Sequence, residues 1–242
     1  MRVPRPDGIE VVPLQGALAV FADASRAPSG WTEAEIARGA ASDLEDLLGR
    51  QVAVLYGFQI HSAVTYLYEP EGPAPTTTLV GRCDGLITAQ PGVALQVRKA
   101  DCLPVALAGG GVVAMVHAGW RGLSADILGR VVSRIGAELG VRPEALTAAI
   151  GVGIGKCHYP VGPEVIEALE GHGVEGTNWR HGDRVDLTSW ACARLVALGL
   201  PPAGVHHLGG CTACSSRHHS YRRDGRLAGR QWGAVVLNPG PA

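Results

Sequence analysis

The sequence has few aromatic residues, almost no net charge and no long apolar run. Phe, Trp and Tyr make up 5% of its 242 residues, and 21 basic residues are balanced by 22 acidic ones for a net charge of −1. The lack of any stretch of about 18 apolar residues argues against a membrane-spanning helix. The even charge balance gives no overall attraction to nucleic acid or acidic membranes. We therefore expect neither as a partner.

The sequence also lacks the cysteine pattern of a secreted disulfide framework. Its six cysteines have no regular spacing, so reduced thiols used for packing, chemistry or metal binding are expected. Near the N-terminus two arginines precede a short apolar stretch, Leu14 to Ala22, as in a signal peptide. Asp7 and Glu10 interrupt that pattern. These features favour a cytoplasmic protein.

No internal repeat is present, and the 34 glycines and 16 prolines are spread along the chain. With 46% hydrophobic and 18% charged residues, the chain can bury a full core. The stretch resembling a loose loop is Glu69 to Thr78, where prolines and small polar residues oppose both helix and central strand. We predict a single domain spanning residues 1–242.

Helical periodicity is clearest from Glu33 to Leu48. Thr32 and Glu35 form a capping-box pair before it, and Gly49 follows its last apolar residue. Other predicted helices run from Ser124 to Leu139, from Pro163 onward, and from Asp186 to Leu198.

Short apolar runs bounded by Gly, Pro or Asp predict buried strands. These runs are Val52 to Phe58, Val93 to Arg98, Pro104 to Ala108, Val112 to His117, Leu146 to Val152, Val205 to Leu208 and Trp232 to Leu237. The triple glycine at 109–111 predicts a hairpin turn. Strands outnumber helices and include adjacent hairpins, so an α/β fold with mixed sheets is predicted.

Three residues able to bind a metal lie at predicted strand boundaries: His61, Cys102 and His117. Two imidazoles and a thiolate can hold a tetrahedral zinc and leave its fourth position open, which is typical of catalytic sites. Taken singly, each residue is more readily interpreted as packing in the core than as a metal ligand. Spacing alone does not show that they converge.

The motif HAGWRG at residues 117–122, with ADCLPV at 100–105, resembles the laccase-domain family, also called the YfiH or purine nucleoside phosphorylase type. Further blocks of the resemblance follow in the family's order: QIH at 59–61, DGLIT at 84–88, IGVGIGKCHYPVGPEV at 150–165, CT at 211–212, SYRRDG at 220–225 and GR at 229–230. The resemblance therefore covers residues 59–230.

The resemblance implies a single-domain αββα sandwich with mixed β-sheets. It also implies a zinc held by His61, Cys102 and His117, which are the expected catalytic residues, with copper as the alternative metal. The implied activities are phosphorolysis of adenosine, inosine, guanosine and methylthioadenosine, and hydrolytic deamination of adenosine. The expected partners are a purine nucleoside and phosphate, and the expected state is a monomer or weak homodimer.

Three residues are predicted to bind substrate: Arg121, Arg222 and Gln59. Arg121 lies between glycines just before the helix expected at Ser124, where a cation and a helix N-terminus suit a phosphate. A surface ion pair is its alternative. Arg222 lies near the pocket in the family's pattern, and Gln59 belongs to the QIH block.

Deamination raises a question of proton transfer. Cytidine-type zinc deaminases carry a glutamate two residues after a histidine ligand, whereas Ala63 stands there here. Asp84 and Asp101 are candidates for that role. The chain also departs from the family's pattern at Lys99, which replaces threonine, and at His158, which replaces cysteine. His218 and His219 replace an aromatic pair, and the loop from Asp23 to Ser29 differs.

Other interpretations remain open. The same site could serve a copper-dependent polyphenol oxidase, a ligand-binding protein in cell-wall maintenance, or a hydrolase in which His117 activates Cys102 as a nucleophile. The segment GVGIG at 151–155 is better interpreted as a tight turn than as a phosphate cradle. Cys211 and Cys214, followed by His218 and His219, resemble half of a zinc finger, but packing is favoured because the ligands are crowded into one short segment.

Overall fold

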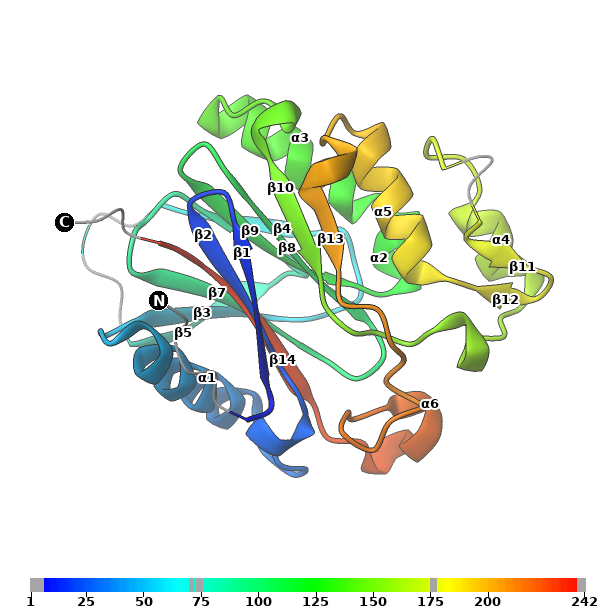
Figure 1. Cartoon of the computed structure of the whole chain (residues 1–242), viewed down its shortest axis with the longest axis horizontal. Coiled ribbons are helices and arrows are strands. Elements are labelled where there is room, and N and C mark those ends of the chain that lie inside the picture. The colour runs from blue at the N-terminus through cyan, green and yellow to red at the C-terminus, as the bar shows by residue number, and fades with distance from the viewer. Residues whose placement is uncertain (1–6, 70–71, 73–75, 175–177, 239–242) are drawn as a thin grey trace.

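The computed structural model describes residues 7–69, 72, 76–174 and 178–238. Two six-stranded mixed sheets lie face to face, with helices on both outer faces (Figure 1). None of the helices in the described part of the chain has the length and apolar character needed to cross a membrane.

The first sheet is antiparallel at one side and parallel at the other. Its strands, in spatial order, are β1 (Ile9–Leu14), β2 (Ala17–Ala22), β14 (Gln231–Leu237), β7 (Val93–Lys99), β3 (Ala53–Phe58) and β5 (Thr77–Arg82). The first four pair antiparallel, whereas β7, β3 and β5 pair parallel.

The second sheet is antiparallel in its centre and parallel at both edges. Its order is β13 (Val205–His207), β10 (Thr147–Ile150), β8 (Leu103–Gly109), β9 (Val112–Ala118), β6 (Gly85–Thr88) and β4 (Thr65–Tyr68). The β13/β10 and β4/β6 pairs are parallel. A separate two-stranded hairpin joins β11 (Arg180–His181) to β12 (Arg184–Val185).

Helices cover the outer faces of both sheets (Figure 1). α1 (Glu33–Leu48) lies on the first sheet; α2 (Trp120–Ser124), α3 (Ile127–Leu139), α4 (Pro163–Leu169) and α5 (Leu187–Ala197) lie on the side of the second. The short α6 (Tyr221–Asp224) precedes β14. Single 3₁₀ turns occupy Ala24–Arg26, Pro143–Ala145, Lys156–His158, Pro202–Gly204 and Gly225–Leu227.

Alternation of side chains along each strand produces three interlayer cores. In β14, Trp232, Ala234 and Val236 pack toward α1. Val235 and Leu237 point the other way, into the core between the two sheets. The third core joins the second sheet to its helices. The predicted αββα sandwich with mixed sheets is therefore confirmed.

The capping signals of α1 act as predicted. The backbone N–H of Glu35 donates to Thr32 Oγ1 at 3.3 Å, and the backbone N–H of Thr32 donates to the Glu35 carboxylate at 2.7 Å. Gly49 ends the helix in the left-handed conformation, with φ of 65°. At the 109–111 turn all three glycines have positive φ, and β8 pairs with β9 as the predicted hairpin.

The helix predicted from Ser124 to Leu139 begins only at Ile127, and Ser124 belongs to a separate short helix. Asp126 adopts φ of 58°, a left-handed conformation that cannot continue a helix. Its carboxylate caps α3 at Gly129 and pairs with Arg194 at 2.7 Å. Ser124 therefore ends α2 and does not cap α3.

The loop predicted from Glu69 to Thr78 is shorter than expected. Thr77 and Thr78 belong to β5, where they pair with β3. Residues 70–71 and 73–75 of that prediction lie outside the described residues.

Candidate active site and metal centre

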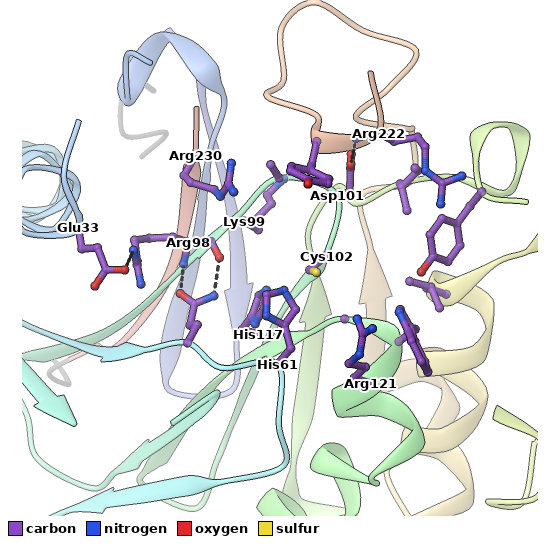
Figure 2. A pocket seen from close by; sticks show the side chains of 18 residues that line it. Glu33, His61, Arg98, Lys99, Asp101, Cys102, His117, Arg121, Arg222 and Arg230 are labelled. Carbon is purple, nitrogen blue, oxygen red and sulfur yellow. Dashed lines mark hydrogen bonds and ion pairs between the residues drawn. The ribbon is translucent and has the colours of Figure 1, made fainter. Parts of the chain in front are cut away.

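The structure brings His61, Cys102 and His117 together at one end of both sheets. His61 follows β3 of the first sheet, Cys102 lies in the crossover from β7 to β8, and His117 lies near the end of β9 in the second sheet. Their ligand atoms all lie within 4.8 Å of one another (Figure 2). The two imidazole rings meet edge to face, with centroids 4.9 Å apart. The elements of both sheets thus contribute to one site.

Asp84 stabilises this arrangement through hydrogen bonds to the segment that carries His61 and to His117. Its buried carboxylate accepts hydrogen bonds from the backbone N–H groups of Ile60, His61 and Ser62 at 2.7–3.2 Å and from the Ser62 hydroxyl at 2.8 Å. These bonds stabilise His61 in a left-handed conformation, with φ of 56°, which is uncommon for a residue other than glycine.

The same carboxylate orients His117. Nδ1 of His117 lies 2.9 Å from Asp84 Oδ1, so Nδ1 carries a proton for this bond and Nε2 is left for a metal. Burial opposes ionisation of Asp84, but the hydrogen bonds from His117 and Ser62 outweigh it and lower its pKa to about 2. Sequence reasoning identified Asp84 only as a candidate proton carrier, whereas here both of its oxygens are engaged.

The charges around Cys102 favour its thiolate. Burial raises the pKa of the thiol, but the neighbouring His117 and His61 reverse the shift and lower that pKa to about 6. Burial lowers the pKa of His117, and Cys102 and Asp84 raise it to about 9. The thiolate is the metal-binding form of cysteine. Two imidazoles and one thiolate fit a zinc with a fourth position open to the cavity.

This cluster forms part of the wall of a cavity of about 530 Å³. Four arginines, Arg98, Arg121, Arg222 and Arg230, contribute to its wall, together with the aromatic residues Trp120, Tyr159 and Tyr221. Figure 2 shows Arg121, Arg222 and Arg230 around the Cys102 and histidine cluster. The volume is in the range of small-molecule sites, and the lining suits an anion attached to a flat ring.

The two arginines predicted to bind substrate each lie against a different aromatic ring. The Arg121 guanidinium lies 4.4 Å from the centroid of the Trp120 ring at the start of α2. The Arg222 guanidinium lies 5.0 Å from the Tyr159 ring and donates to the carbonyl of Pro160 at 3.2 Å. Since α2 is short and begins at Trp120, Arg121 lies inside its first turn. The expected support from a long helix beginning at Ser124 is absent.

Gln59 lines the cavity, but its amide is bonded to the backbone. Its Nε2 donates to the Arg98 carbonyl at 2.7 Å, and its Oε1 accepts from the Arg98 N–H at 2.8 Å. The Arg98 guanidinium in turn pairs with Glu33 at the cavity wall. The substrate contact predicted for Gln59 stays a prediction, and the geometry shows it joining the chain after β3 to β7.

Asp101 is fixed by the loops around it. It has φ of 87°, and its carboxylate accepts from Thr212 Oγ1 at 2.5 Å and from the Arg222 N–H at 2.6 Å. Its carbonyl accepts from the Ile154 N–H at 2.8 Å. A Cβ at Gly153 would lie 2.9 Å from that carbonyl oxygen, so the glycine-rich segment makes a close turn against this loop, as favoured from sequence.

Lys99 is fully buried beside the site. Its Nζ donates to the Val152 carbonyl, and burial lowers the pKa of this amine to about 7, against the raising effect of Asp101.

The imidazole of His219 bonds to the Ala27 carbonyl at 2.8 Å. His219 therefore joins the loop from Asp23 to Ser29, which departs from the family's pattern, to the segment before β14.

His218 predicts a pH effect on stability. Burial, followed by the charge of Lys99, lowers its pKa from 6.5 to about 4, and its Nδ1 has no hydrogen-bond partner within the described chain. Between pH 6.5 and 4 the unfolded chain therefore binds a proton at this residue that the folded chain does not. The free energy of unfolding should fall with decreasing pH across that window.

Urea denaturation of the wild type and of His218→Gln at pH 7 and pH 4.5 tests this. The wild type should lose more stability between the two pH values, because other acid-titrating groups are common to both proteins. Equal losses would show that His218 does not carry the effect.

Gly119 explains part of the HAGWRG motif. A Cβ at Gly119 would lie 2.8 Å from Cys102 Sγ and 3.5 Å from His61 Cδ2, while its φ of −84° is accessible to alanine. We expect Gly119→Ala to displace the sulfur and weaken metal binding roughly 10- to 100-fold, the range for disturbed ligand orientation, with little change in melting temperature of the metal-free protein. Competition with a zinc-sensitive dye measures the affinity. Unchanged affinity would contradict the close contact, and Gly140→Ala at a helix end, where φ is 69°, is the control for a general effect on folding.

A model of the multi-copper polyphenol oxidoreductase laccase family matches residues 33–238. The chain belongs to this family. Its HAGWRG and ADCLPV motifs, which carry the resemblance seen in the sequence, contain Cys102 and His117.

Relatives of this chain include proteins named purine nucleoside phosphorylase. One from Deinococcus radiodurans is 37% identical over 158 residues, covering 64% of this chain and 61% of that protein. One from Streptomyces coelicolor is 38% identical over 189 residues, covering 74% of each. The matched part of this chain thus spans about three fifths of the Deinococcus protein.

Two solved structures share the fold of this chain. YlmD from Geobacillus stearothermophilus superposes with a TM-score of 0.80 at 23% identity, covering 97% of this chain and 100% of that one. YfiH from Bacillus licheniformis gives a TM-score of 0.79 at 22% identity, covering 91% and 92%. The layered arrangement of sheets and helices is therefore shared with both proteins.

Proposed function

We propose that this chain is a zinc-dependent purine nucleoside phosphorylase that also deaminates adenosine. The observation that carries the proposal is the cavity wall, which holds a three-ligand His61, Cys102 and His117 cluster within reach of four arginines and three aromatic rings. Relatives named purine nucleoside phosphorylase support it. The candidate substrates are adenosine, inosine, guanosine and methylthioadenosine.

In phosphorolysis, a phosphate oxygen forms a bond to C1′ of the ribose while the bond from C1′ to the purine nitrogen breaks. The purine leaves with the electron pair and takes up a proton. A bound zinc would supply Lewis-acid polarisation of a substrate heteroatom. Arg121 and Arg222 would hold the phosphate through charge-assisted hydrogen bonds, while Trp120 and Tyr159 provide flat apolar surface for the purine.

Deamination of adenosine would replace the amino group at C6 by a water oxygen and release ammonia. It needs a group that moves a proton from the water to the leaving nitrogen. Asp84 and Asp101 are engaged by hydrogen bonds on both oxygens, and Glu33 pairs with Arg98. We therefore propose phosphorolysis as the faster reaction and deamination as the slower one.

The proposal gives Arg121 a measurable effect. Removing a charge-assisted hydrogen bond worth about 1.5–3 kcal/mol should raise the KM for phosphate in Arg121→Ala roughly 10- to 100-fold. Arg130→Ala on α3, whose side chain contacts the Ala125 carbonyl, is the control and should retain the wild-type KM. If both variants match the wild type, Arg121 does not bind phosphate.

The experiment that tests the function pairs metal analysis with product chromatography. Protein purified without added metal is supplied with adenosine or inosine, with and without phosphate. Free base and ribose 1-phosphate formed only with phosphate would support phosphorolysis, and inosine formed from adenosine in either condition would support deamination. Bound zinc without purine products would overturn the proposed activity.

Two rival activities predict other outcomes of the same preparation. Copper with oxygen uptake on phenols would favour the oxidase that the family's description names. The thiolate favoured at Cys102 by its two histidines raises the second rival, a cysteine nucleophile. Rapid alkylation of Cys102 by iodoacetamide in metal-free protein, with no metal bound as purified, would favour that reading.

A further inference from the structure

A second group of metal-ligating side chains lies outside the proposed catalytic cluster of His61, Cys102 and His117. Cys157 and His158 occupy the 3₁₀ turn after the glycine-rich segment, and Cys211 and Cys214 lie in the loop that follows β13. One ligand atom from each of the four lies within 4.8 Å of the others. Since the two pairs are more than 50 residues apart in sequence, the fold and not local spacing brings them together.

Four of the six distances between these atoms match the edges of a zinc tetrahedron. The sulfurs of Cys157 and Cys214 are 3.5 Å apart, and Nδ1 of His158 lies 3.3 Å from each of them and 3.8 Å from Cys211 Sγ. Zn–S bonds of about 2.3 Å and Zn–N bonds of about 2.0–2.1 Å give edges of about 3.8 Å between sulfurs and about 3.6 Å between sulfur and nitrogen. The observed edges agree to within about 0.3 Å. The sulfur separation is well beyond the roughly 2.05 Å of a disulfide bond.

The surroundings of the cluster also suit thiolate ligands. Cys211 is buried, and the backbone N–H groups of Gly155, Ala213 and Cys214 point to its sulfur. Such N–H donors stabilise a thiolate and fix its direction. A Cβ at Gly155 would lie 3.0 Å from Cys211 Cβ and 3.4 Å from Cys157 Sγ, so a side chain at this position would crowd both cysteines. Cys157, His158 and Cys214 are exposed, which gives a metal a path of entry.

We propose that Cys157, His158, Cys211 and Cys214 form a structural zinc site. Three thiolates and one imidazole complete a tetrahedron without an open position, which is the pattern of structural and not catalytic zinc. The ligand set is not the one suggested by the sequence, because the imidazole comes from His158. His218 and His219 take no part in the group.

The position of the site gives it a role in shaping the cavity. Tyr159 follows the ligand His158 directly, and the Arg222 guanidinium donates to the carbonyls of His158 and Pro160. On the other loop, Thr212 lies between the two cysteine ligands and bonds to Asp101. Both loops have little regular secondary structure, so a metal joining them would remove much of their conformational freedom. The zinc would thus fix the positions of these two loops relative to each other, and with them the parts of the cavity wall that the loops support.

Metal content per chain tests the proposal directly. Protein is produced with zinc supplied, purified under reducing conditions and analysed by mass spectrometry for metals. The wild type should bind two zinc ions per chain, Cys214→Ser and Cys102→Ala one each, and the double variant none. Cys192→Ser, which alters a half-buried cysteine of α5 outside both groups, should keep two. A wild type that binds no more zinc than Cys214→Ser would overturn the proposal.

A measurement on the unmodified protein covers the case in which a variant does not fold. Cys157 and Cys214 are exposed, so iodoacetamide can reach free thiols there. We expect both to be protected as purified and to react after treatment with a chelator, as identified by peptide mapping. Rapid alkylation before chelation, or a disulfide between Cys157 and Cys214, would contradict the zinc site. Because neither readout depends on turnover, failure of this proposal is distinguishable from failure of the proposed enzyme activity.

Discussion

Cys102→Ala is expected to abolish metal binding at the catalytic cluster and to lower nucleoside phosphorolysis by about 10³-fold or more. The variant leaves two imidazoles, the exposed His61 and the buried His117. Two ligands hold zinc far more weakly than three. A bound metal contributes several kcal/mol to a transition state, and about 4 kcal/mol corresponds to about 10³ in rate. Steady-state kinetics with inosine and phosphate, alongside zinc analysis, measures both effects.

The matched control is Cys192→Ala on α5, which removes a thiol outside both cysteine and histidine clusters. It should retain wild-type turnover. Far-ultraviolet circular dichroism of Cys102→Ala should be unchanged, because the residue lies in a crossover and not in a strand. Full activity in a folded Cys102→Ala protein that has lost the metal of this cluster would contradict the assignment of the site.

Asp84→Ala is expected to destabilise the fold by about 3–5 kcal/mol, the cost of removing one partner from a buried charged pair. The change would leave three backbone N–H groups, the Ser62 hydroxyl and His117 Nδ1 without their acceptor. The loop carrying His61 would also lose the bonds that hold its left-handed backbone. Urea denaturation monitored by tryptophan fluorescence measures the change.

Asp84→Asn separates stability from metal orientation. The amide keeps the shape of the side chain and one carbonyl acceptor, but its NH₂ group cannot accept from the remaining donors. We expect a smaller loss of stability than in Asp84→Ala, together with zinc affinity reduced roughly 10- to 100-fold, as found for groups that orient histidine ligands. If Asp84→Ala unfolds at the same urea concentration as the wild type, the proposed role of this carboxylate is wrong.

Local signals in the sequence predicted the long elements well. The capping box at Thr32 and Glu35 and the apolar stripe behind it fix α1, and continuous apolar runs predict β7, β8, β9 and β14. Such runs are buried on both faces here, because each central strand lies between a helix layer and the other sheet. The edge strands β1, β4 and β5 were not predicted, since partly exposed strands here lack a clear alternating pattern. The buried strands β2 and β6 were also missed. The break at Asp126 was missed because a left-handed residue leaves little trace in helical periodicity.

The candidate site was predicted in part for a different reason. His61, Cys102 and His117 lie in motifs distinctive enough to indicate the family. The roles of Asp84 and Gln59 depend on bonds to backbone atoms of distant segments, which no pattern of side chains displays. The same applies to the second cluster. Cys211 and Cys214 are adjacent enough to be noticed, but their partners Cys157 and His158 become visible only when β10 and β13 pair and bring their following loops together.

His61, Cys102 and His117 belong to different layers: His61 follows a strand of the first sheet, His117 lies near the end of a strand of the second, and Cys102 lies where the chain passes between the two sheets. An ion bound to these three residues would join the two sheets to each other. Its binding free energy would then count toward folding, and the melting temperature would rise with free zinc. Under the proposed function, the supply of zinc would then affect the folded fraction of the chain as well as its activity.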